Sequence, residues 1–143
     1  MKKRLWMVSV LLIPALTAMG AANGKWLKKV PDADRKRVNP YAGQPEAAAA
    51  GKILFRDNCA KCHGADANGQ HGRPSLRSER IQNATDGEIA WILKNGDPWK
   101  GMPSWSSLPE QQRWQLVTYI RSLPLAVSAP TKTGSQPEKG EKQ

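Results

Sequence analysis

The stretch Cys59-Ala60-Lys61-Cys62-His63 is the part of this sequence that decides the fold. Its two cysteines are the only two in a chain of 143 residues. A disulfide bond between them would close a very short loop, and closing such a loop removes little conformational entropy from the unfolded chain. The two thiols are therefore expected to have another role.

The spacing C-x-x-C-H is typical of covalent haem attachment. Two thiols about one helical turn apart can add to the two vinyl groups of one haem. The histidine that follows can then present an imidazole nitrogen to the iron from the same side. The sequence therefore predicts one haem c, attached through Cys59 and Cys62, with His63 as an axial ligand of the iron.

Two other uses of the cysteine pair fit the sequence less well. A thioredoxin-like redox pair needs a βαβ context, and the chain has no run of alternating apolar and polar residues that would indicate strands. A zinc site could use four residues: Cys59, Cys62, His63 and His71. Adjacent residues such as Cys62 and His63, however, rarely reach the same tetrahedral ion. A zinc-binding small domain is therefore kept only as an alternative.

Met102 is the candidate for the second axial ligand of the iron. The other three methionines lie within the first 22 residues, and Met102 lies in the Gly-Met-Pro sequence at 101–103. Methionine usually fills core gaps from a helix, and this loop offers no helical stripe for it to join. The alternative ligand, His71, lies in a glycine-rich loop and is expected to be exposed. An open sixth position would instead indicate a haem enzyme or a gas sensor.

The residues around the motif carry clear helix signals. One helix is predicted over 46–58, where a run of alanines favours helix. A second begins with the capping box at Thr85 and ends at Asn95-Gly96. A third follows Ser107, the expected N-cap, and stops before Pro124. The predicted fold class is all-α, with three main helices and long loops around a haem that completes a core too small to be stable alone.

The first 22 residues have the pattern of a secretory signal peptide. Lys2, Lys3 and Arg4 precede an apolar run, and small residues follow, with Ala22 as the expected last residue before the cut. An uncleaved anchor is the alternative, because the apolar stretch is near the lower limit of the roughly 17–25 residues that span a bilayer. The chain is expected to be periplasmic or otherwise exported, and tethered to the membrane if this segment stays attached.

The net charge of +10 is concentrated outside the predicted globular part. Residues 23–45 hold six basic and two acidic residues, whereas residues 46–125 are nearly balanced. Nucleic-acid binding is not expected, because it needs a basic face on the folded domain. Residues 23–45 are predicted to be a flexible basic arm that contacts an anionic membrane surface or an acidic partner and has little effect on the haem. Residues 126–143 are predicted to be a flexible tail.

The segment from about Glu46 to Leu123 resembles a class I cytochrome c, a small monohaem electron carrier. The resemblance rests on the C-x-x-C-H motif, on the Gly-Met-Pro loop and on the flanking helices. It implies that the first and last helices cross at a small residue and an aromatic pair, for which Gly51, Phe55 and Tyr119 stand at suitable positions.

The resemblance also implies three further residues of the haem site. Pro74, in Arg73-Pro74-Ser75-Leu76, would accept a hydrogen bond from the ring of His63 through its carbonyl oxygen. Leu76 would pack on the haem ring, and Trp105 would lie near a haem propionate.

The resemblance implies one-electron transfer with histidine and methionine as axial ligands, in which the chain alone performs no substrate chemistry. Its partners would be redox proteins, namely an exported dehydrogenase, an oxidase or another cytochrome. The alternative is a haem subunit docked to an exported dehydrogenase or to a terminal oxidase complex.

Overall fold

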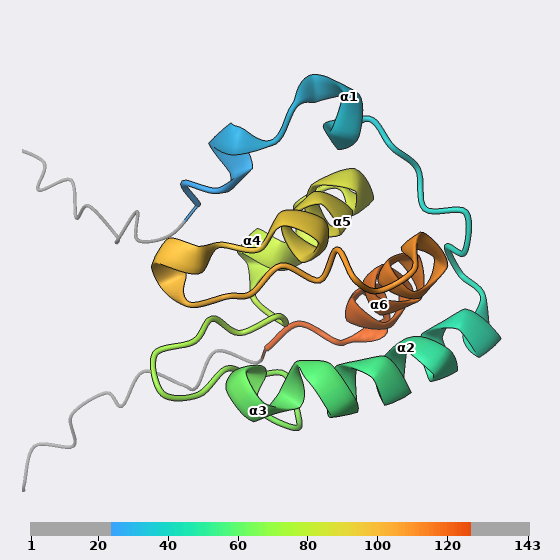
Figure 1. Ribbon diagram of the computed structural model, residues 1–143. Coiled ribbons are helices and arrows are strands. Elements are labelled where there is room, and N and C mark those ends of the chain that lie inside the picture. The colour runs from blue at the N-terminus through green and yellow to red at the C-terminus, as the bar shows by residue number, and fades with distance from the viewer. Residues whose placement is uncertain (1–23, 127–143) are drawn as a thin grey trace, which may run out of the picture.

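The computed structural model describes residues 24–126, and within them the fold is helical (Figure 1). The elements are η1 (Leu27–Lys29), α1 (Asp32–Arg35), α2 (Pro45–Asn58), α3 (Ala60–His63), α4 (Glu79–Gln82), α5 (Asp86–Asn95), η2 (Pro98–Lys100) and α6 (Glu110–Ser122). The predicted all-α class is confirmed. The expected signal peptide and the expected tail after residue 126 lie outside the described residues.

Helices α2 and α6 pack against each other along the lower half of the molecule (Figure 1). A Cβ atom on Gly51 would lie 2.0 Å from the backbone oxygen of Gln115, so the two helices are close enough to require glycine here. Beside this contact the rings of Phe55 and Tyr119 lie with their centres 5.2 Å apart. The expected crossing at a small residue and an aromatic pair is present.

Helix α5 completes the core above this pair of helices. Its buried side chains include Ile89, Ile92 and Leu93, which form one stripe at helical spacing. The short helix α4 is attached to α6 by Arg121, whose guanidinium donates to the backbone oxygens of Ile81 and Gln82. The long loops expected over 64–84 and 97–106 each contain a short helix, α4 in the first and η2 in the second.

The predicted N-terminal cap is present in α5 and absent in α6. Thr85 and Glu88 form the predicted capping box at the start of α5. Ser107 does not cap α6, because Pro109 has extended backbone angles and the helix begins only after it. Proline has no side-chain acceptor, so the backbone N–H groups of the first turn of α6 receive no side-chain cap from it.

The prediction that residues 23–45 are a flexible arm is wrong for the part that the structure describes. Residues 24–44, here called the N-terminal strap, include η1 and α1, pass over α5 and lead into α2 (Figure 1). Val30 is only 4% exposed and Asn39 only 3%. The prediction missed these buried positions because most residues of the segment are polar or charged.

The strap also neutralises part of its own charge through contacts with the helices. Arg35 forms an ion pair with the buried carboxylate of Glu88. Arg37 pairs with Glu110, and its guanidinium carbon lies 5.1 Å from the ring centre of Trp114, a cation–π contact. Two of the basic residues that were expected to serve an external partner therefore bind within the chain.

Among residues 24–126, no helix has both the length and the apolar character needed to cross a membrane.

Candidate functional site

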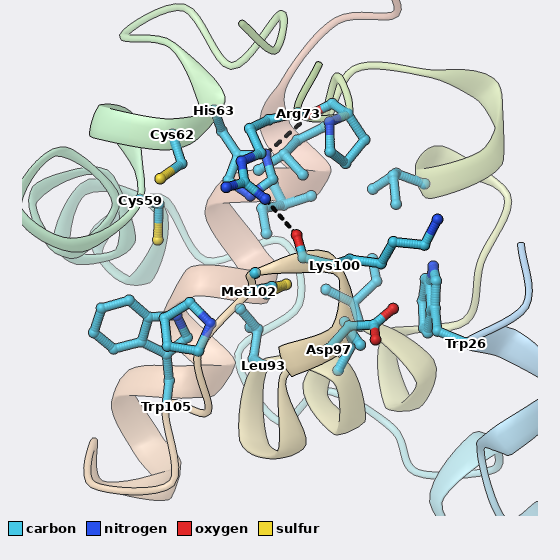
Figure 2. A pocket seen from close by; sticks show the side chains of 18 of the residues that line it. Trp26, Cys59, Cys62, His63, Arg73, Leu93, Asp97, Lys100, Met102 and Trp105 are labelled. Atoms are coloured by element: carbon cyan, nitrogen blue, oxygen red, sulfur yellow. Dashed lines mark hydrogen bonds between the residues drawn. The ribbon is translucent and has the colours of Figure 1, made fainter. Parts of the chain in front are cut away.

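A cavity of about 530 Å³ opens between α3, α5 and the loop that precedes α6. Its walls include Cys59, Cys62, His63 and Met102, together with apolar side chains such as Leu93. The volume is within the range of roughly 300–1,000 Å³ that holds small molecules and cofactors. The residues that the sequence singled out therefore share one pocket (Figure 2).

The C-x-x-C-H motif forms a single helical turn at the end of α2. The backbone N–H groups of Cys62 and His63 both donate to the carbonyl oxygen of Cys59, at 3.0 and 2.9 Å. This turn brings the two sulfur atoms to one side of the pocket (Figure 2). The geometry fits two neighbouring thioether bonds to one group.

The ring of His63 is buried and oriented by a backbone carbonyl. Its Nδ1 lies 2.9 Å from the oxygen of Pro74, which is the hydrogen bond that the resemblance implies. A carbonyl can only accept, so Nδ1 carries the proton and Nε2 is the nitrogen that can bind a metal ion. Such a partner fixes the orientation and the tautomer of the ring.

The two cysteine thiols lie in different environments. Burial, with a smaller contribution from Cys62, raises the pKa of the Cys59 thiol to about 11. Cys62 is exposed, and the two sulfurs do not form a disulfide bond. A thioether has no ionisable proton, so covalent attachment of a ligand would leave no titratable group at this buried sulfur.

Met102 is held by a tight backbone loop. The backbone N–H of Met102 donates to the carbonyl oxygen of Asp97 at 3.0 Å, and the N–H of Asp97 donates to the carbonyl oxygen of Met102 at 2.9 Å. The short helix η2 lies between the two residues. Gly101 turns the chain with a φ of 71°. Figure 2 shows the sulfur of Met102 inside the pocket that also holds His63. The backbone bonds therefore hold the loop that carries this thioether, and the side chain packs against the hydrophobic core.

Leu76 and Trp105 also line the pocket. The backbone N–H of Trp105 donates to the carbonyl of Leu93, at 2.9 Å, which fixes the start of the loop before α6. In Figure 2 the Trp105 ring lies on the same side of the pocket as Cys59. The expected role of Trp105 beside a haem propionate stays a prediction.

His71 does not belong to this arrangement. It is exposed, has a φ of 49° and is not among the residues that line the pocket. Within the described part of the chain, no three or more His, Cys, Asp or Glu side chains gather closely enough to hold a metal ion by themselves. The zinc alternative therefore lacks the ligand set it needs.

Sequence reasoning missed several polar residues of the pocket wall: Lys25, Arg73, Arg80, Asp97 and Lys100, with Trp26 beside them. Lys25 and Trp26 belong to the strap, which was expected to be flexible. The spacing of Trp26, Leu27 and Val30 was the available signal, because three apolar residues within one helical turn are unusual in a solvated linker.

The donors in the pocket fit a haem c. Two adjacent sulfurs, one oriented imidazole and one thioether are the groups that bind haem covalently and complete its axial coordination. The cationic residues of the wall suit the two carboxylates that a haem carries. The fold and this site together define a monohaem c-type cytochrome domain.

The comparisons with known proteins give the family. Residues 46–120 match the family model described as cytochrome C oxidase, cbb3-type, subunit III, and the chain belongs to this family. The FixP subunit of the cbb3-type cytochrome c oxidase of Rhizobium meliloti (strain 1021) is 40% identical over 84 residues, which cover 56% of this chain and 29% of FixP. The chain thus spans less than a third of the length of that relative.

A second relative matches almost over its whole length. Cytochrome c-554(547) of Halothiobacillus neapolitanus is 38% identical over 87 residues, which cover 53% of this chain and 96% of that protein. Among solved structures, cytochrome CL of Methylophaga aminisulfidivorans MPT superposes with a TM-score of 0.55 at 23% identity, covering 77% of this chain and 72% of that one. This structural likeness supports the cytochrome c fold.

Proposed function

We propose that this chain is an exported monohaem c-type cytochrome that transfers one electron at a time. Cys59 and Cys62 would hold the haem through thioether bonds, and His63 and Met102 would bind its iron. When bound, the haem supplies a Fe(II)/Fe(III) couple. The observation that carries the proposal is the presence of all four side chains in one pocket, with Nδ1 of His63 already bonded to Pro74.

The residues of the pocket have distinct roles in this proposal. The carbonyl of Pro74 orients the ring of His63 and fixes its tautomer. The thioether of Met102 is a weak donor, which favours the less charged state of the centre. Apolar walls such as Leu93 exclude water, and this also penalises the more charged state. The reduction potential is therefore expected to be raised relative to a centre with two imidazole ligands.

A redox titration of the purified protein tests the proposed activity. The absorbance should follow a single one-electron transition that is fully reversible. The proposal is contradicted if the protein shows no redox-active absorbance, or if the transition needs two electrons.

The second candidate function is a haem subunit docked to a larger exported complex. The family match favours a terminal oxidase of the cbb3 type over a dehydrogenase as that complex. Two measurements with a cbb3-type oxidase distinguish a subunit from a free carrier. They are co-purification with the oxidase and oxygen uptake by the oxidase when it is supplied with the reduced protein. A subunit should co-purify with the oxidase, whereas a free carrier should support turnover without staying bound.

Export to the periplasm rests on the first 22 residues and is part of the proposal. The intact mass of the protein isolated from the periplasm tests it, since a cleaved signal peptide leaves a chain that begins after Ala22. Contact of residues 23–45 with an anionic membrane surface would depend on basic residues other than Arg35 and Arg37, because these two pair with Glu88 and Glu110.

A further inference from the structure

The N-terminal strap reaches the wall of the pocket although it precedes the region that matches the family. The family match begins at residue 46, and the strap ends two residues earlier. Lys25 and Trp26 nevertheless line the cavity, and Trp26 is partly buried against the hydrophobic core. The pocket therefore has a wall that the family match does not account for.

The strap is fixed to the domain at several points, so its end cannot move far. A Cβ atom on Gly87 would lie 1.9 Å from the backbone oxygen of Asp34, which shows how closely α1 approaches α5. Arg35 bonds to the carbonyl oxygen of Leu27 at 2.9 Å as well as pairing with Glu88, and so ties η1 to α5.

The far end of the strap is also attached. Asn39 is buried, and its side-chain amide donates to the hydroxyl of Thr118 at 3.0 Å. That hydroxyl lies 3.2 Å from the carbonyl oxygen of Tyr41, to which it can donate. The strap is thus held by α5 at one end and by α6 at the other.

Trp26 and the cysteines lie on opposite sides of the pocket (Figure 2). In a haem the vinyl groups that form thioethers belong to one edge of the ring and the two propionates to the opposite edge. The side of the pocket away from the cysteines is therefore the side where two carboxylates need partners. Four cationic side chains and a single carboxylate line the pocket, namely Lys25, Arg73, Arg80, Lys100 and Asp97.

We propose that the strap forms part of the haem site, in which Trp26 closes the edge opposite the cysteines and Lys25 binds a haem propionate. The inference rests on the proposed function, since it assumes that haem occupies the pocket. Trp26 excludes water from this edge, and Lys25 offsets the charge of a propionate. Both effects stabilise the reduced state relative to the oxidised one, so the strap raises the reduction potential.

This inference reverses the expectation that residues 23–45 leave the haem unaffected. It is tested by spectroelectrochemical midpoint potentials of four variants: Lys25→Ala, Trp26→Ala, Trp26→Phe and Gly87→Ala. Lys28→Ala is the matched control, because Lys28 is an exposed cation of the same strap that does not line the pocket.

The Lys25 and Trp26 variants test the wall itself. Lys25→Ala should lower the potential, shifting the equilibrium toward the oxidised form by roughly two- to fivefold, as for loss of an exposed charge pair. Trp26→Ala should also lower it, because water reaches the edge of the pocket that the indole ring covers. Trp26→Phe should restore most of the loss, since it keeps an aromatic wall.

Gly87→Ala tests the strap without touching the pocket. Alanine favours helix, so α5 is not weakened, but the new Cβ should push α1 away from it. Its potential should fall in the same direction, and the strap should become sensitive to protease.

The result that overturns the inference is a potential for Lys25→Ala and Trp26→Ala that equals that of Lys28→Ala. The haem content of each protein, measured as a pyridine haemochrome, distinguishes a failure of the proposed function from a failure of the inference about the strap. If the wild-type chain carries no covalent haem, the proposed function fails. If haem is attached and these variants match the control, the strap clamps α5 and α6 without forming part of the site, and only the inference fails.

Discussion

Met102 and His63 are positioned by backbone groups that come from separate loops. The carbonyl of Pro74 holds the His63 ring, and the paired backbone bonds to Asp97 hold the loop of Met102. The bonds between Met102 and Asp97 use backbone atoms of both residues, so replacing the Met102 side chain should leave its loop in place. The bond to Pro74 uses the His63 ring and would be lost with it. Met102 can therefore be tested by itself.

Met102→Ala should leave the haem attached and expose one face of the iron. The reduction potential should fall, because the weak thioether donor is lost. Cyanide should bind at least about tenfold more tightly, which corresponds to about 1.4 kcal/mol. Absorbance titration with cyanide and a redox titration measure the two effects.

His71→Ala is the control for this experiment, because His71 is exposed and does not line the pocket. It should change neither cyanide affinity nor potential. If His71→Ala alters both and Met102→Ala alters neither, the assignment of the axial ligand is wrong.

At the scale of the elements, the contact between α2 and α6 leaves no room for a side chain at Gly51. Gly51→Ala would place a Cβ atom 2.0 Å from the oxygen of Gln115, so the helices must separate. The free energy of unfolding should fall by about 1–3 kcal/mol, the usual cost of overpacking. Chemical denaturation of the haem-loaded protein measures it.

Lys52→Ala, at the next and exposed position of α2, is the matched control for Gly51→Ala. It should change the free energy of unfolding by no more than about 0.5 kcal/mol. Equal effects of the two substitutions would contradict the crossing as described.

The attachment of the strap to α6 should depend on pH through Glu110. Arg37, followed by the indole N–H of Trp114, lowers the pKa of Glu110 from its usual value of 4.5. A lowered pKa in the folded state means that the carboxylate stabilises the fold above about 4.5 and that this contribution is lost as the pH falls through the lower value. The pair is exposed, so its coupling should not exceed about 1 kcal/mol.

A double-mutant cycle with Glu110→Gln and Arg37→Met, measured by denaturation from neutral to acidic pH, tests this dependence. The coupling should be present at neutral pH and vanish in acid. A coupling that is independent of pH would show that the ion pair does not hold the strap.

The elements that could be predicted from the sequence are those whose signals are local. The capping box of Thr85 and Glu88 spans four residues, and the C-x-x-C-H motif spans one turn. The strap was missed because its contacts are distant in sequence: Arg35 and Glu88 are 53 positions apart, and Arg37 and Glu110 are 73 apart. The sequence does not show that a distant carboxylate neutralises these arginines, so their charge was interpreted as available to an external partner.

The same limit applies to the candidate site. The C-x-x-C-H spacing indicated Cys59, Cys62 and His63, because it is typical of haem attachment. The Gly-Met-Pro loop indicated Met102, because a methionine there has no helical stripe to join. Pro74 came from the family resemblance. Trp26 was not assigned, because the spacing of Trp26, Leu27 and Val30 indicates packing against the domain but not a place in the pocket wall.

At the scale of the whole molecule, the haem should be a structural component as well as a redox centre. The cavity of about 530 Å³ lies among Ile89, Ile92, Leu93 and Ile120, so without a ligand these side chains would face a void or water. A domain of this size buries too little apolar surface to tolerate such a loss.

The double variant Cys59→Ala/Cys62→Ala should therefore lack covalent haem and be largely unfolded, as judged by near-UV circular dichroism. The single variant Cys62→Ala should keep one thioether and most of the fold. A haem-free double variant that unfolds cooperatively would show that the chain alone forms a sufficient core.

The central claim is that one haem is covalently bound through Cys59 and Cys62. The most direct measurement is the intact mass, under denaturing conditions, of the protein produced in a host that attaches haem to c-type cytochromes. The predicted result is the mass of the processed chain plus one haem, with the haem absent from the double cysteine variant. A mass equal to that of the chain alone, or a haem that dissociates on denaturation, would contradict the claim.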